Sequence, residues 1–127
     1  MPDNRKLILV ADDDPGMRMI LGHILAAEGY AVINTDNGRS ALEMAQSEHP
    51  DLMILDMNMP FLDGLEVLRR LRSLEPPLEY PAILLTAGDP NILKDPAESL
   101  GAVRFLEKPF DLDVLLQEIK KNLKTQG

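Results

Sequence analysis

The sequence predicts an α/β fold with a parallel, doubly wound sheet, and two observations point to that class. Five short apolar runs alternate with amphipathic helical patterns along the 127 residues. Turn-forming residues bound the runs, as is typical of strands that helices cover on both faces. Strands that alternate with helices in this way pair in parallel through right-handed crossovers.

Periodicity and turn residues place the individual elements. We expect five strands, at residues 6–11, 30–34, 51–55, 82–86 and 103–106. We expect four helices, at residues 15–28, 38–48, 62–74 and 110–124.

Several helix ends carry recognisable signals. Asp14 can cap the first helix, Pro15 suits its first position, and Gly29 can end it. Asp111 stands near the start of the last helix, and lysines near its end suit the helix dipole. Between residues 87 and 100, Pro90 and Pro96 remove backbone donors, so any helix there is expected to be short or to start late.

Composition narrows the class of protein. A chain of 127 residues is expected to form a single domain over 1–127, with roughly two-thirds of its unfolded surface buried. The sequence has no cysteine, no apolar stretch near the ~18 residues of a membrane span and no signal-peptide pattern, so we expect a cytoplasmic protein without membrane contact. A net charge of −8 and only five aromatic residues argue against direct nucleic-acid binding.

Polar residues stand where the predicted strands end. Asp12 and Asp13 follow the first strand, Asp56 the third, Thr86 ends the fourth, and Lys108 follows the fifth. Side chains at the carboxyl ends of neighbouring parallel strands meet in one crevice. Three carboxylates and one ammonium group leave a charge of −2, and carboxylate oxygens suit Mg²⁺ or Mn²⁺, so we expect a metal here.

Simpler explanations apply to some of these residues. Asp14 and Asp63 are explained by helix capping alone. His23 and His49 have no partners at metal-ligand spacing, and we interpret them as a helix residue and a turn residue. A single cap does not account for both Asp12 and Asp13, and the turn after Asp56 needs no acid there.

Four motifs in order resemble the receiver domain of response regulators in two-component signalling. They are Asp12-Asp13; Leu55-Asp56-Met57-Asn58-Met59-Pro60 followed by Asp63-Gly64; Thr86-Ala87; and Phe105 with Lys108-Pro109-Phe110. The resemblance runs from about residue 6 to residue 123. It implies a flavodoxin-like (βα)₅ domain, like the chemotaxis receivers, with strand order 2-1-3-4-5.

The resemblance also implies a role for each site residue. Asp56 would be the phosphoacceptor, taking a phosphoryl group from a sensor histidine kinase or a histidine phosphotransfer protein. Asp13, Asp56 and the backbone carbonyl of Asn58 would bind Mg²⁺ directly, and Asp12 would act through metal-bound water. Thr86 and Lys108 would bind the remaining phosphoryl oxygens, Thr86 and Phe105 would form the switch, and the Lys108–Pro109 peptide would be cis.

This interpretation describes a signalling module that catalyses its own phosphorylation and dephosphorylation and is not a turnover enzyme. Its downstream partner would be an output domain or protein, and the isolated domain is expected to be a monomer. One alternative is a pseudo-receiver that serves only as an interaction scaffold, which loss of Asp56, Asp13 or Lys108 would favour. Another is an aspartyl-phosphate phosphohydrolase, which would need an acid where Asn58 stands.

Overall fold

A computed structural model describes residues 5–87 and 102–123 of the chain. Its core is one five-stranded sheet in the order β2-β1-β3-β4-β5, in which all neighbouring strands are parallel. The strands are β1 (Leu7–Ala11), β2 (Ala31–Thr35), β3 (Leu52–Asp56), β4 (Ala82–Thr86) and β5 (Ala102–Glu107). The described helices are α1 (Pro15–Ala27), α2 (Gly38–Glu48), α3 (Gly64–Arg72) and α5 (Leu112–Asn122). The fold class and the strand order are those predicted.

Side-chain caps fix where three of the helices begin. Every predicted element is present, with ends shifted by at most two residues. Asp14, Asp63 and Asp111 each accept a hydrogen bond from a backbone N–H of the first helical turn, which fixes the starts of α1, α3 and α5. The segment that holds Pro90 and Pro96 lies outside the described residues.

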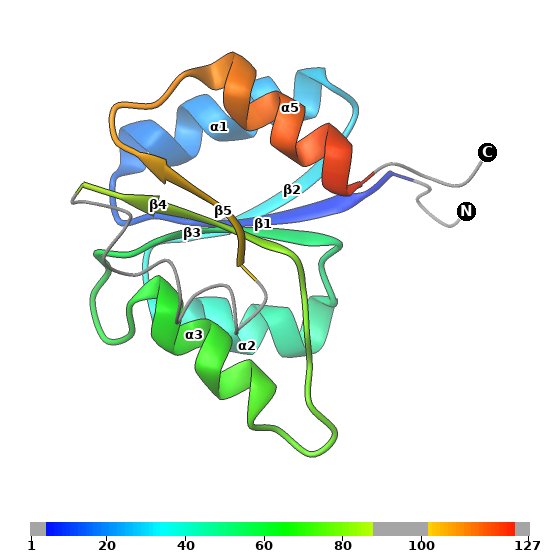
Figure 1. The fold of residues 1–127 in the computed structure, drawn as a ribbon, viewed down its shortest axis with the longest axis vertical. Coiled ribbons are helices and arrows are strands. Elements are labelled where there is room, and N and C mark those ends of the chain that lie inside the picture. Colours follow the sequence, from blue (N-terminus) through cyan, green and yellow to red (C-terminus); the bar gives the residue numbers. More distant parts are fainter. Residues whose placement is uncertain (1–4, 88–101, 124–127) are drawn as a thin grey trace.

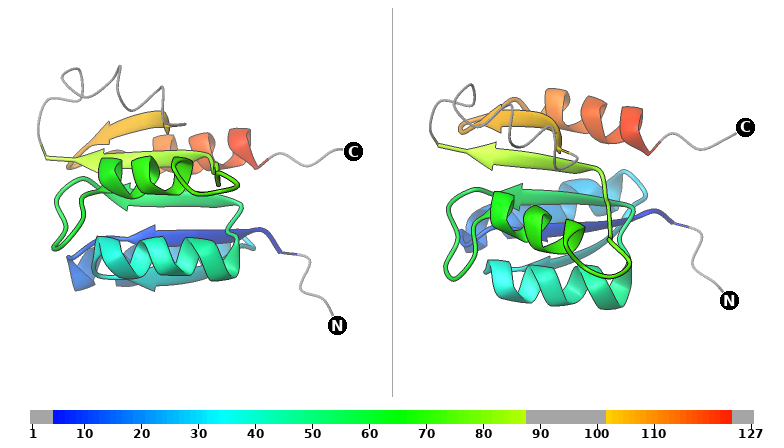
Figure 2. Two further views of the ribbon diagram at one scale, coloured as in Figure 1. Left: turned by 90° about the horizontal axis from the view of Figure 1, so that it is seen from below. Right: turned by 60° about the horizontal axis from the view of Figure 1, so that its bottom comes forward.

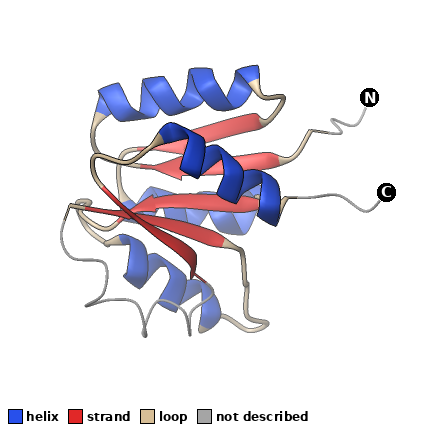
Figure 3. Cartoon of the chain, turned by 45° about the horizontal axis from the view of Figure 1, so that its top comes forward, coloured by secondary structure: helices blue, strands red, loops and turns tan. Residues whose placement is uncertain are grey.

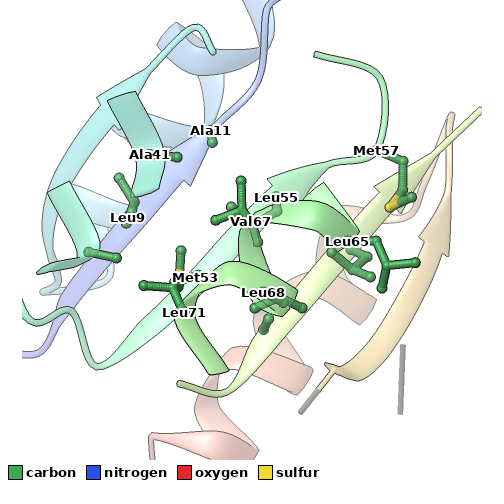
Figure 4. Close-up of a cluster of buried hydrophobic side chains, with 13 residues drawn as sticks. Leu9, Ala11, Ala41, Met53, Leu55, Met57, Leu65, Val67, Leu68 and Leu71 are labelled. Atoms are coloured by element: carbon green, nitrogen blue, oxygen red, sulfur yellow. The ribbon is translucent and has the colours of Figure 1, made fainter. Parts of the chain in front are cut away.

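The helices form two layers around the sheet (Figure 1). Helices α1 and α5 cover one face, and α2 and α3 cover the other, as the turned views in Figure 2 also show. Successive residues of β1 point to opposite faces: Ile8 and Val10 belong to the apolar cluster under α1 and α5, while Leu9 and Ala11 belong to the cluster under α2 and α3. Figure 4 shows this second cluster.

Burial on both faces explains the continuous apolar runs. All five residues of β3 and all five of β4 are buried, because helices cover both sides of these central strands. Parallel pairing brings the carboxyl ends of the strands to one edge, where the arrowheads in Figure 3 point. Within residues 5–87 and 102–123, no helix is long and apolar enough to cross a membrane.

Candidate functional site

Three acids meet at the carboxyl edge of the sheet. Asp12 and Asp13 follow β1, Asp56 ends β3, and these two strands are neighbours. Each of the three acids offers a carboxylate oxygen, and these oxygens lie within 4.8 Å of one another. Asp12 and Asp56 are buried, whereas Asp13 is exposed. The structure therefore brings the acids together as the sequence predicted.

Both buried carboxylates are fully partnered, and in the same way. One oxygen of each accepts a backbone N–H: Asp56 Oδ1 from Asn58 at 3.0 Å, and Asp12 Oδ1 from Asp14 at 2.9 Å. The other oxygen of each accepts from Lys108 Nζ, at 3.2 Å for Asp56 and 3.1 Å for Asp12. One ammonium group thus bridges two carboxylates that would otherwise repel each other.

The main chain places Lys108 at this position. Its N–H donates to the carbonyl of Thr86 at 2.8 Å, which ties the segment after β5 to the end of β4. The Lys108–Pro109 peptide is cis, as expected. With its side chain 23% exposed, the residue reaches the acids from the surface of the site.

Burial and neighbouring charges shift the pKa values of Asp56 and Lys108. Burial raises the pKa of Asp56, and the charge of Asp12 raises it further, against the opposing effects of the Asn58 N–H and of Lys108. Burial alone would lower the pKa of Lys108, but its hydrogen bond to Asp12 and the charges of Asp56 and Asp12 raise that pKa overall. Lys108 is therefore charged, and Asp56 is harder to ionise than an ordinary aspartate.

The donor set fits a hard divalent cation. Three carboxylates and one ammonium group carry a charge of −2 when all are ionised. Mg²⁺ takes one or two carboxylates and keeps other positions for water and phosphate oxygens. Asp13 is exposed beside the two buried acids, so solvent reaches the site on its side.

Thr86 and Phe105 lie near each other on one face of the sheet. The register pairs Leu84 with Phe105 and Thr86 with Glu107. Because side chains alternate along a strand, Thr86 and Phe105 are diagonal neighbours on the same face. Thr86 is buried, and Phe105 is half-buried against the cluster under α2 and α3.

Two contacts of the site were not anticipated from the sequence. Arg18 Nη1 donates to the backbone carbonyl of Asp12 at 2.8 Å, so α1 helps to fix the acidic turn. A signal for it was present, since Arg18 lies one helical turn after Asp14 and long side chains point back towards the start of a helix. The second contact is the hydrogen bond from the N–H of Asn58 to Asp56, whereas the sequence had suggested a role only for the Asn58 carbonyl.

Comparison with known proteins agrees with this geometry. A family model described as "Response regulator receiver domain" matches residues 8–120. The chain belongs to this family. The match covers all five strands apart from Leu7, and most of α5.

The similar proteins are either about as long as this chain or about twice as long. The chain is 37% identical over 117 residues to the sporulation initiation phosphotransferase F of Bacillus subtilis, covering 91% of this chain and 92% of that protein. It is 42% identical to the response regulator MprA of Mycolicibacterium vanbaalenii over 92% of this chain, but spans only 50% of that protein. The response regulator TrrA of Thermotoga maritima, solved in complex with Mg²⁺ and BeF, superposes with a TM-score of 0.80 at 37% identity, covering 93% of this chain and 99% of that one.

Proposed function

We propose that this receiver domain accepts a phosphoryl group on Asp56 from a phosphohistidine of a sensor histidine kinase or histidine phosphotransfer protein. The observation that carries the proposal is the setting of Asp56, a buried carboxylate at the end of β3 that faces a second buried acid and shares its lysine. In the transfer, an Asp56 oxygen forms the new P–O bond as the P–N bond of the partner breaks. The electron pair of that bond returns to the imidazole nitrogen.

The chain supplies alignment and charge for this step. Phosphoryl transfer depends mainly on positioning and electrostatic stabilisation. A carboxylate needs no general base because it is ionised at neutral pH. Lys108 and Thr86 would bind phosphoryl oxygens, with Lys108 released from part of its contact with Asp56.

Asp13, Asp56 and the backbone carbonyl of Asn58 would hold Mg²⁺ directly, and Asp12 would act through a metal-bound water. The bound cation would neutralise charge on the carboxylates and the phosphoryl oxygens. The Thermotoga response regulator supports this proposal, because it has the same fold and was solved in complex with Mg²⁺ and BeF.

A signalling module that changes conformation on phosphorylation is favoured over a pure interaction scaffold and over a phosphohydrolase. Loss of Asp56, Asp13 or Lys108 would favour a pure interaction scaffold, and all three residues are present. A phosphohydrolase would need an acid at position 58, and the residue there is Asn. We propose that the phosphorylated receiver acts through a downstream output domain or protein, and that the unphosphorylated domain is monomeric.

Labelling by acetyl phosphate tests the dependence on metal. The parent protein is expected to gain one phosphoryl group in the presence of Mg²⁺ and none after treatment with EDTA, as measured by intact mass. Asp13→Asn should label at least about tenfold more slowly, because ligand loss at a metal site has effects of that order or larger. Asp14→Asn is the matched control, since Asn caps a helix as well as Asp does. Equal labelling rates for the two variants would contradict the assignment of Asp13.

A second test concerns the switch. An acyl phosphate on Asp56 adds negative charge and acceptor oxygens, and we expect Thr86 to move towards it and Phe105 to follow. Beryllofluoride, which stands in for the phosphoryl group, should shift the amide resonances of Thr86 and Phe105 far more than those of β2. Thr86→Ala should bind beryllofluoride but lose most of the shift at Phe105. A full shift in this variant would show that Phe105 responds by another route.

A further inference from the structure

The loop after the phosphoacceptor contains a strained turn at Phe61. The N–H of Leu62 donates to the carbonyl of Pro60 at 2.9 Å, which closes a three-residue turn around Phe61 with φ of 73°. Such γ-turns with positive φ are rare and strained, and a bulky residue at positive φ is an outlier. The Phe61 side chain is 70% exposed, so burial in the core does not compensate for this strain. Strain of this kind is kept at functional sites when the surroundings impose it.

The turn contacts the start of α2 at three points. The N–H of Gly38 donates to the carbonyl of Pro60 at 3.3 Å. The guanidinium carbon of Arg39 lies 4.8 Å from the centroid of the Phe61 ring, within the range of a cation–π interaction. A Cβ atom at Gly38 would overlap the carbonyl oxygen of Leu62, so only glycine allows this approach. We call Gly38, Arg39 and Phe61 the loop latch.

The same loop contacts Asp56 near both of its ends. The N–H of Asn58 donates to Asp56 Oδ1 at 3.0 Å. At the other end, Gly64 lies so close that an added Cβ would be 3.0 Å from the carbonyl oxygen of Asp56. Between these ends, the loop latch holds the loop from the side of α2. The loop that carries Asn58 therefore contacts α2 as well as Asp56.

We propose that Arg39 and Phe61 are positioning residues for the metal site. The loop latch holds residues 58–63 in the conformation that presents the backbone carbonyl of Asn58 to the divalent cation. This inference rests on the proposed function, which assigns that carbonyl to the metal. Simple electrostatics predicts the opposite effect for Arg39, because removal of a nearby positive charge should strengthen cation binding. The sign of the change thus separates positioning from charge.

The test measures binding of Mg²⁺ alone by isothermal titration calorimetry. Arg39→Ala and Phe61→Leu are each expected to weaken binding about two- to fivefold, the size that an exposed cation–π contact supports. Arg39→Lys and Phe61→Tyr keep a cation and a ring, and should bind as the parent does. The double variant should be no weaker than either single one, because both remove the same contact. Arg70→Ala is the control for loss of an exposed arginine, since Arg70 pairs only with Glu66 on α3 among the described residues.

A metal-free measurement supplies a second result. Hydrogen exchange at the Leu62 amide should be faster in Arg39→Ala than in the parent, because the turn closed by that amide is no longer held. Unchanged or tighter Mg²⁺ binding in Arg39→Ala would overturn the proposal. If Asp13→Asn still loses Mg²⁺ binding in that case, the proposed function stands and only the loop latch fails. If Asp13→Asn binds Mg²⁺ as the parent does, the metal site itself is wrong.

Discussion

Asp56→Asn is expected to take up no phosphoryl group from acetyl phosphate and, without divalent cations, to unfold at a higher temperature than the parent. Labelling is lost because the amide has no nucleophilic carboxylate oxygen. Stability rises because burial and the charge of Asp12 disfavour the ionised form of Asp56, which is why its pKa is raised. The amide keeps an oxygen that can accept from the N–H of Asn58.

The gain in stability has a defined pH dependence. A carboxyl group whose pKa is raised by folding destabilises the protein while it is ionised, at pH values above that pKa. As the pH falls below the raised value, Asp56 of the folded parent takes up a proton while the unfolded chain is still ionised, so the penalty shrinks and is gone below the ordinary pKa of an aspartate. The difference in melting temperature between Asp56→Asn and the parent, a few degrees at neutral pH, should therefore shrink in acid.

Asp63→Asn serves as the matched control for this prediction. Asp63 lies in the same loop, but its carboxylate caps α3 by accepting from the N–H of Glu66. Asparagine caps equally well, so this variant should label and melt as the parent does. A labelled Asp56→Asn protein, or one that is less stable than the parent at neutral pH, would contradict the role assigned to Asp56.

Lys108→Met should have the opposite effect on stability, lowering the free energy of unfolding of the metal-free protein by about 2–4 kcal/mol. The variant leaves Asp12 and Asp56 buried without the ammonium group that bridges them. The raised pKa of Lys108 means that its contribution is present in full at neutral pH and is lost only as the pH rises through the folded value. Chemical denaturation at neutral pH measures the difference.

Two comparisons identify the cause of that loss. Asp56→Asn should restore part of the stability of Lys108→Met, because it removes one of the unpaired charges, and Mg²⁺ should do the same. Lys120→Met is the control, since Lys120 forms an exposed pair with Glu28 and should change stability by less than about 1 kcal/mol. If both lysine variants are equally stable, the buried bridge has no structural role.

The sequence predicted the fold and the meeting of the acids because both follow from local signals. Apolar runs of strand length, and caps such as Asp14 and Asp63, define the elements, and parallel strands must end at one edge. The meeting of Asp12 and Asp56 then follows from the adjacency of β1 and β3, in the strand order that the resemblance to receiver domains implied.

The contacts that sequence reasoning could not supply are those between distant main-chain segments. Lys108 contacts both Asp12 and Asp56, and these two contacts depend on the path of the chain after β5. Leu62 lies against Gly38, and no sequence pattern predicts that these two segments meet. The positive φ of Phe61 is also not predicted, because a bulky residue locally prefers negative φ. Tertiary contacts with α2 override that preference.

The location of the phosphoryl group decides most directly whether Asp56 is the phosphoacceptor. After labelling with acetyl phosphate and Mg²⁺, borohydride reduction converts an aspartyl phosphate to homoserine, and peptide mass spectrometry then locates the changed residue. We expect conversion at Asp56 alone, in the peptide that spans the end of β3. Conversion at Asp12 or Asp13, or no conversion in a protein that binds Mg²⁺, would contradict this assignment.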